Sequence, residues 1–238
     1  MTYFQSKPAA TERALDTGAE TVASHPPAGL VKAQILARDV ANAAAEYAWP
    51  GMTELDLARW AEEELRAGGS SGLWTRVNVG FGAGTLMCFP TEAPTDRMLW
   101  NVDCGHIDVH PVVDGWWGDC TRTFVVGDQP EYREAQALIQ SIHDTVLTAG
   151  YPGMPACELW QVFDDCIAGS GWTHLDRLGN IGHSIGRSVS YTKGYIDRHN
   201  TTPMWEAWAV EPFIGNGTFG VKVEDVVWFG PQGCQVLR

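Results

Sequence analysis

Two aspartates flank a predicted hairpin turn and could bind a cation together. Asp108 and Asp119 are eleven residues apart, and Asp114-Gly115 between them is typical of a two-residue turn. Such a turn would place the two carboxylates on facing arms of the hairpin. Two carboxylates held close together repel each other unless a cation or a shared proton lies between them. The pair therefore predicts a site for a metal ion or for a shared proton.

Three further polar residues lie in apolar or glycine-rich surroundings. His183 stands between two glycines in GHSIG (residues 182–186), which leaves its ring sterically free to face a pocket. Glu211 and Glu224 each interrupt an apolar run, and a buried carboxylate is unfavourable unless it is paired or bound to a metal. Taken singly, each residue also fits an ordinary role as a surface carboxylate or a hydrogen-bonded core histidine. Together with the two aspartates they favour a metal site.

The order and spacing of these residues resemble those of the pita-bread metallopeptidases of family M24, which include prolidases, aminopeptidases P, methionine aminopeptidases and creatinases. The sequence carries DCTRTF at 119–124, GHSIG at 182–186 and GVKVEDVV at 220–227, in the family's order. The resemblance covers about residues 29–238 and implies an α+β pita-bread fold. It also implies two divalent metal ions, with the ligands Asp108, Asp119, His183, Glu211 and Glu224.

The chemistry of this ligand set favours certain metals. Four carboxylates and one imidazole are hard, oxygen-rich ligands that suit manganese, cobalt or iron, with zinc as a further candidate. In a two-metal hydrolytic site, a hydroxide bridging the ions attacks the scissile bond while the metals polarise its carbonyl group. The resemblance implies that Glu211, besides binding metal, passes the proton.

The chain departs from the family at two positions. Peptidases of the family carry one histidine before the first aspartate and another about seven residues after GHxIG; Phe89 and Ser190 occupy these places here. In the family those histidines contact the substrate amide and stabilise the tetrahedral intermediate. Losing one such donor costs roughly 2.7–4 kcal/mol, so we expect weak ordinary peptidase activity. We also expect no N-terminal domain of the kind that prolidases and aminopeptidases P place before this fold.

Other residues could replace the missing histidines or line a pocket. His106, Asp108 and His110 alternate, so on a strand all three share one face. Either histidine could therefore be a proton donor at the metals, or have a structural role. Aromatic and polar residues near the motifs could surround a small substrate, although core packing suits the aromatic ones equally well. These candidates are Phe89, Trp116, Trp117, Ser190, Tyr191 and His199.

The elements that must position these residues form an internal repeat. At an offset of 102 residues, Pro50-Gly51-Met52 matches Pro152-Gly153-Met154. Each copy predicts a helix, a Pro-Gly break, a second helix and then a strand-rich segment. We therefore expect one catalytic domain at 27–238, preceded by a flexible extension at 1–26. Its two duplicated halves, at about 29–128 and 131–238, would surround a curved antiparallel sheet. The predicted helices are residues 29–48, 54–69, 131–150 and 155–169.

The composition of the chain argues against several classes of protein. The formal net charge of −13 argues against a nucleic-acid partner. No apolar run is long enough for a transmembrane helix, and the N-terminus does not resemble a secretory signal. The six cysteines show no C-x-x-C spacing, so reduced thiols and a cytoplasmic location are expected. A short peptide or small molecule is the expected partner, and a homodimer stays open.

Three functions remain in competition. The first is a metal-dependent hydrolase that cuts an Xaa-Pro or N-terminal peptide bond. The second is a family member repurposed to break or rearrange a C–N or related bond in a small non-peptide molecule. The third is a non-catalytic binding module, which would need none of the five ligands. The ligand set favours the first, and the two missing histidines favour the second.

Overall fold

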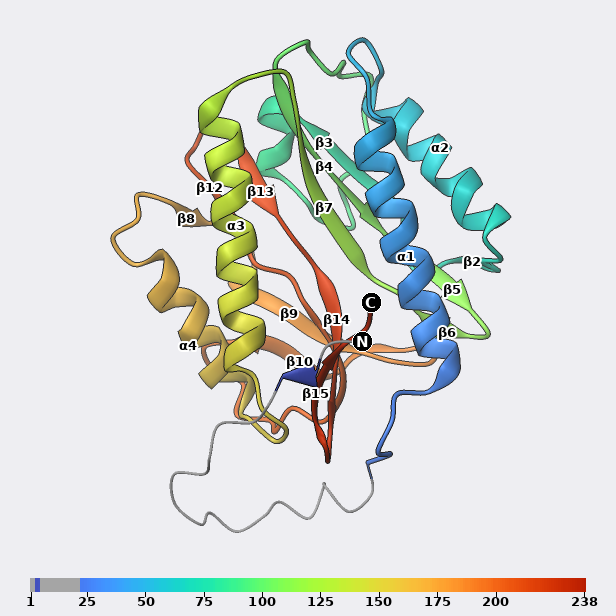
Figure 1. The fold of residues 1–238 in the computed structure, drawn as a ribbon, viewed down its shortest axis with the longest axis vertical. Coiled ribbons are helices and arrows are strands. Elements are labelled where there is room, and N and C mark those ends of the chain that lie inside the picture. Colours follow the sequence, from blue (N-terminus) through green and yellow to red (C-terminus); the bar gives the residue numbers. More distant parts are fainter. Residues whose placement is uncertain (1–2, 5–21) are drawn as a thin grey trace.

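The computed structural model describes residues 3–4 and 22–238. Most of the predicted extension at 1–26 therefore lies outside the described residues. Two helix pairs flank a set of antiparallel strands (Figure 1). Helices α1 and α2 lie on one side of this view and α3 and α4 on the other. The α+β architecture expected from the sequence, with helices packed against antiparallel strands, is confirmed.

The helices match their predicted positions closely. Local signals account for this agreement: α2 begins at Thr53, whose hydroxyl accepts a hydrogen bond from the Asp56 backbone while the Asp56 carboxylate bonds back to Thr53. A Pro-Gly pair follows the first helix of each half. The helices are α1 (Ala28–Tyr47), α2 (Glu54–Ala67), α3 (Pro130–Ala149) and α4 (Ala156–Ile167).

The joint between the paired helices has the same backbone structure in both halves. Gly51 donates a hydrogen bond to the carbonyl of Leu99 at 2.8 Å, and Gly153 donates one to the carbonyl of Met204 at 2.9 Å. Both glycines have positive φ, 98° and 77° respectively. Glycine adopts this conformation without steric cost. The repeated sequence thus produces a repeated joint that ties each helix pair to its own strands.

The first half supplies two small antiparallel sheets and a short 3₁₀ helix (Gly82–Leu86). The sheet orders are β3-β4-β7 and β2-β5-β6. The strands are β2 (Gly72–Leu73), β3 (Asn78–Phe81), β4 (Asp103–Val109), β5 (Pro111–Val113), β6 (Trp116–Trp117) and β7 (Cys120–Val126).

The second half supplies most of a six-stranded antiparallel sheet, ordered β1-β15-β14-β11-β9-β10, and a smaller sheet, β13-β12-β8. Strand β1 (Tyr3–Phe4) pairs with the last strand. The other strands are β8 (Thr173–His174), β9 (Asn180–Ile185), β10 (Ser190–Asp197), β11 (Glu206–Val210), β12 (Phe213–Gly215), β13 (Gly220–Lys222), β14 (Asp225–Gly230) and β15 (Gly233–Val236).

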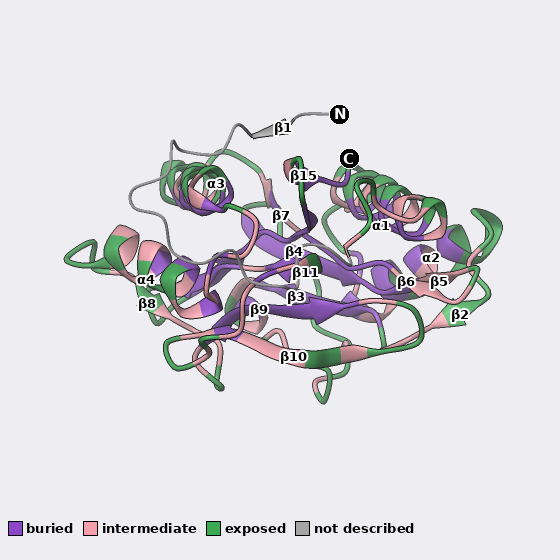
Figure 2. Cartoon of the chain, turned by 90° about the horizontal axis from the view of Figure 1, so that it is seen from below, coloured by how far each residue is buried: buried purple, intermediate pink, exposed green. Residues whose placement is uncertain are grey.

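Apolar packing holds each helix pair against the strands. One cluster lies under α3 and α4 and includes Leu159 and Trp208, both fully buried. Another lies under α1 and α2 and includes Leu57 and Ile107. A third joins Leu30 of α1 to strands of the second half. Figure 2 shows the central strands buried between the helices and the more exposed β10.

Polar contacts join the two halves where β7 meets the end of β13 and the start of β14. The Thr123 hydroxyl donates to the carbonyl of Lys222 at 2.8 Å and accepts from its backbone N–H at 2.9 Å. Arg122 Nη2 lies 2.8 Å from Asp225 Oδ1. Side chains of the TRTF motif therefore fix the position of the VKVED segment.

Two further observations concern membrane-spanning helices and the state of the cysteines. No helix in the described part of the chain combines the length and apolarity that a bilayer crossing needs. All six cysteines lie within the described residues and are free thiols.

The first glycine of GHSIG gives a testable prediction. Gly182 has φ of 145°, and a Cβ atom there would overlap the carbonyl oxygen of Ala209 on β11. Gly182→Ala should therefore lower the free energy of unfolding by about 2 kcal/mol or more, measured by urea denaturation. Gly186→Ala is the matched control, because the nearest atom to its Cβ would be 3.6 Å away. Equal stability of the two variants would contradict this account.

Candidate metal centre

The predicted hairpin turn is present at the expected residues. Asp114 and Gly115 connect β5 to β6, and both have positive φ, 53° and 78°. Two successive positive φ angles are typical of the type I′ turn that matches strand twist. The turn returns the chain from β4 and β5 to β7, so residues on both arms reach the same region.

The strand register decides which residues face each other across this hairpin. Asp108 pairs with Thr121, and the ladder ends one residue later, at Val109. Continued by one more residue, the register places His110 opposite Asp119, with Asp108 on the diagonal. The two carboxylates approach each other as expected, but a histidine lies between them.

The second half brings its residues to the same place. His183 lies on β9, which pairs with β11 through Ala209, and Glu211 directly follows β11. Glu224 lies between β13 and β14, and its Oε2 accepts a hydrogen bond from the Thr121 hydroxyl at 2.7 Å. Residues from four separate segments of the chain thus converge.

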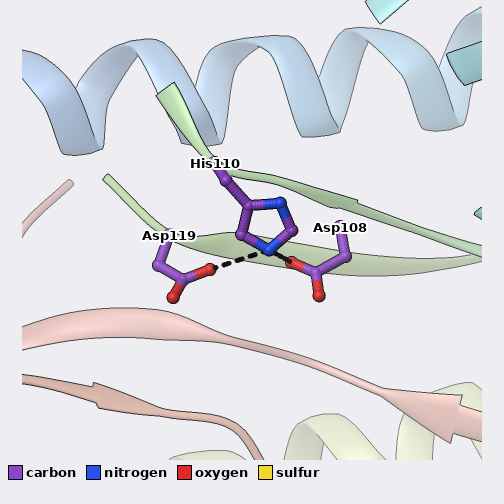
Figure 3. Close-up of side chains that lie close together, drawn as sticks. All are labelled: Asp108, His110 and Asp119. Carbon is purple, nitrogen blue, oxygen red and sulfur yellow. Dashed lines mark ion pairs between the residues drawn. The ribbon is translucent and has the colours of Figure 1, made fainter. Parts of the chain in front are cut away.

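The distances within the centre are those of groups in direct contact. His110 Nε2 lies 3.2 Å from Asp108 Oδ1 and 3.5 Å from Asp119 Oδ1 (Figure 3). His183 Nε2 lies 3.4 Å from Asp119 Oδ2 and 3.8 Å from Glu211 Oε1. The Glu211 side chain is the most exposed of the group, at 18%.

Two sets of three residues have the spacing that a metal ion requires. In each set, the candidate ligand atoms all lie within 4.8 Å of one another, and every residue is buried. The sets share Asp119, so the two candidate groups adjoin each other. One set is Asp108, His110 and Asp119, and the other is Asp119, His183 and Glu224.

Buried oxygen atoms in the centre lack hydrogen bonds. Asp108 Oδ1, Asp119 Oδ1 and Glu224 Oε1 accept none within the described residues. Buried polar atoms are normally satisfied, and an anionic oxygen without a donor is unfavourable. Divalent cations held by the two candidate groups would satisfy all three, so the residues present fit a metal centre.

Lys222 also belongs to the centre, although it was not among the predicted site residues. Its Nζ lies 2.7 Å from Glu211 Oε2, 3.2 Å from Asp108 Oδ2 and 3.3 Å from Glu224 Oε2. The signal was available in the sequence, because strand alternation places Lys222 and Glu224 on one face.

The pKa values of the charged groups are shifted because these groups are buried and lie close together. Burial raises the pKa of Glu224 well above its usual value, and the charge of Asp119 adds to the effect. Burial also opposes ionisation of Asp108, but His110 and Lys222 outweigh it and hold the pKa of Asp108 well below its usual value. Burial lowers the pKa of Lys222, but the surrounding carboxylates raise it well above its usual value. The centre therefore favours a proton on Glu224 and a charged ammonium on Lys222.

Ser190 and Tyr191 both contact His183. Ser190 Oγ lies 2.9 Å from His183 Nδ1 and donates to the carbonyl of Ser184 at 3.0 Å. With Nδ1–H donating to Ser190, the lone pair of Nε2 points toward the carboxylates. The Tyr191 ring centroid lies 4.5 Å from that of His183.

Two stacked tryptophan rings lie beside His110 and His183. Trp74 stacks on Trp117, with ring centroids 4.9 Å apart and planes 3° from parallel. Its edge-on contacts reach His110 at 5.1 Å and His183 at 5.9 Å. Trp74 was not predicted because it lies between β2 and β3 without a motif around it.

Two predicted pocket residues contact other parts of the molecule. The Arg177 guanidinium lies 4.1 Å above the ring of Phe89. The side chain of Trp116 packs closely against Gly29, at the start of α1. A role for either residue in substrate binding stays a prediction.

The remaining histidines differ in their surroundings. His106 Nε2 lies 3.3 Å from Asn78 Oδ1, and burial, with the nearby charge of Lys222, lowers the pKa of His106 to about 4. His106 is therefore neutral near pH 7. His199 is exposed and accepts a hydrogen bond from Arg198 Nε at 2.9 Å.

Comparisons with known proteins identify relatives of this chain. The methionine aminopeptidase of Chlamydia muridarum is 32% identical over 131 residues, which cover 52% of this chain and 44% of that protein. The Xaa-Pro dipeptidase of Pyrococcus furiosus is 25% identical over 210 residues, covering 87% of this chain and 59% of that protein.

A solved structure shows the same fold. The dipeptidase PepE from Mycobacterium ulcerans superposes with a TM-score of 0.79 at 26% identity, covering 90% of this chain and 58% of that one. The matched regions are thus less than two thirds of the length of each of these three proteins. The sequence model of metallopeptidase family M24 matches residues 28–230, which is most of the chain. This protein therefore belongs to metallopeptidase family M24.

Proposed function

We propose that the protein is a divalent-metal-dependent hydrolase that cleaves an amide-like bond in a short peptide, at an Xaa-Pro or N-terminal position. The observation that supports this most directly is the convergence of buried carboxylate oxygens that accept no hydrogen bonds. Such a group is unfavourable in a purely structural core and favourable around cations. The names of the related proteins, methionine aminopeptidase and Xaa-Pro dipeptidase, support the same reaction class.

The proposed ligands offer hard oxygen and imidazole donors for two ions. Manganese, cobalt or iron would suit this set best, with zinc as a further candidate. When bound, such ions supply an acidified water as nucleophile and polarise the scissile carbonyl group. The residues that would hold them are Asp108, Asp119, His183, Glu211 and Glu224.

Glu211 is our candidate for the residue that moves a proton. Its Oε2 is held by the Lys222 ammonium at 2.7 Å, while its Oε1 faces His183. It is also the least buried carboxylate of the centre, so a substrate can approach it. We propose that Oε1 accepts a proton from the attacking water and delivers it to the leaving amine.

Trp74, Trp117 and Tyr191 would form one wall of the substrate pocket. The stacked tryptophans are fixed by the hydrogen bond from Trp74 Nε1 to the carbonyl of Gly118 at 2.8 Å. Tyr191 is 38% exposed and connects this wall to the surface. A rigid aromatic face of this kind orients a small apolar or cyclic group.

A second candidate function is cleavage of a C–N or related bond in a small non-peptide molecule. The residues at the two family histidine positions favour it. Ser190 is engaged with His183 and Ser184, and the ring of Phe89 lies beneath Arg177. Neither offers an imidazole to a tetrahedral intermediate.

The metal content tests the proposed function first. Asp108→Ala, Asp119→Ala and Glu224→Ala should each abolish divalent-metal binding or reduce it to one ion per chain, measured by elemental analysis after dialysis against Mn²⁺. Asp114→Ala is the control on the same hairpin, because its side chain is 67% exposed. A variant that retains two ions would remove that residue from the ligand set. A wild-type protein without stoichiometric metal would instead support a non-catalytic binding module.

Lys222 should contribute most to the free energy of unfolding when metal is removed. In EDTA, Lys222→Met should lower the free energy of unfolding by about 3 kcal/mol, because it leaves buried carboxylates without their ammonium partner. Added Mn²⁺ should shrink that loss by neutralising the same carboxylates. Lys193→Met is the matched control, since its 2.7 Å ion pair with Glu206 is half-exposed. If Lys222→Met is as stable as the wild type in EDTA, the Lys222 ammonium does not stabilise the buried carboxylates as proposed.

Peptidase activity should be limited by the two replaced histidines. With Mn²⁺ or Co²⁺ present, turnover of Xaa-Pro dipeptides and methionyl peptides should fall well below the usual range of roughly 1–1,000 per second. The double variant Phe89→His, Ser190→His should raise it. Wild-type turnover within the usual range would refute this prediction and favour an ordinary peptidase.

A further inference from the structure

His110 occupies an unusual position for a residue with no assigned ligand role. Its Nε2 points between two carboxylates, 3.2 Å from Asp108 Oδ1 and 3.5 Å from Asp119 Oδ1 (Figure 3). Those two carboxylates belong to the proposed ligand set. The three atoms also satisfy the mutual spacing of a metal-binding group.

The surrounding structure fixes the imidazole in this position. His110 stands at the corner between β4 and β5, and its carbonyl accepts a hydrogen bond from the Trp74 backbone at 3.2 Å. The Trp74 ring packs against the imidazole nearly edge-on, at 84°. The first contact fixes the backbone of His110 and the second restricts its ring, which preorganises the imidazole for one ligand geometry.

The hydrogen-bond inventory of the two aspartates favours a cation among the three groups. Asp108 Oδ1 and Asp119 Oδ1 accept no hydrogen bond from the part of the chain that the structure describes, and the aspartate side chains are 7% and 2% exposed. A single N–H on Nε2 can be aligned with only one of these oxygens. A cation held by the Nε2 lone pair and both carboxylates satisfies all three buried atoms together.

We propose that His110 is a sixth protein ligand of the metal centre, binding the ion held between Asp108 and Asp119. This inference rests on the proposed function, because it presumes that the centre binds metal. It replaces the proton-donor role predicted from the sequence, since the nitrogen that would donate is the one that coordinates. The two ion positions would then each have one imidazole, from His110 and from His183.

The proposal makes a prediction about metal preference. An imidazole ligand favours Co²⁺ and Zn²⁺ over Mg²⁺ and Mn²⁺ more than carboxylates alone do. His110→Asn should therefore weaken Co²⁺ binding at one position by at least about tenfold and weaken Mn²⁺ binding less. Equilibrium dialysis of each metal alone measures both constants without reference to activity. His199→Asn is the control for an exposed histidine and should bind both ions as the wild type does.

A direct count of bound imidazoles completes the test. Proton NMR of the Co²⁺-loaded wild type should show two exchangeable, hyperfine-shifted N–H signals, one from each coordinated histidine. His110→Asn should lose one of them and retain the other. If circular dichroism shows that the variant does not fold, the number of shifted N–H signals in the wild type tests the proposal instead. A single signal there would overturn it.

The other outcomes separate this inference from the proposed function. If His110→Asn binds two Co²⁺ ions with wild-type affinity, the ligand role of His110 is wrong and the metal-dependent hydrolase stands. If the wild type binds neither Co²⁺ nor Mn²⁺, the proposed function fails and this inference fails with it.

Discussion

The structure depends on keeping four carboxylates close together in a buried place. Like unit charges 4 Å apart repel by about 4 kcal/mol even at an effective dielectric constant of 20. Lys222 offers one opposing charge, and burial raises the pKa of Glu224 well above its usual value, which shows that its negative charge is unfavourable there. Asp108 Oδ1 and Asp119 Oδ1 still accept no hydrogen bond from the described residues, although both lie near His110 Nε2. Divalent cations would neutralise this excess of buried negative charge. The proposed metal-dependent function is based on that requirement.

The duplicated architecture explains how such a centre is assembled. One apolar cluster lies beneath each helix pair, and the cluster under α3 and α4 also includes Cys104 of β4. The halves then contribute complementary parts, Asp108 and Asp119 from one and His183, Glu211 and Glu224 from the other. Hydrogen bonds from the TRTF motif to the VKVED segment fix their separation. The relative position of the two sets of residues therefore depends on contacts between the halves.

Much of this could be predicted from the sequence where local signals are strong. The Pro-Gly breaks, the Thr53 cap and the Asp114-Gly115 turn are encoded within a few residues, so the helices and the hairpin were predicted close to their observed positions. Contacts between distant segments were harder. Trp74 has no motif around it, and its stacking on Trp117 depends on tertiary packing. The place of His110 opposite Asp119 depends on where the β4–β7 ladder ends, a register that alternation alone does not define.

The central claim is that this junction holds divalent metal ions, and anomalous diffraction tests it most directly. Crystals equilibrated with Mn²⁺ and measured on both sides of the manganese absorption edge would locate any bound ion. The account predicts two anomalous peaks on either side of Asp119, one near His183 and Glu224 and the other near Asp108 and His110. The absence of any peak among these residues, in crystals where Mn²⁺ is bound elsewhere or not at all, would contradict it.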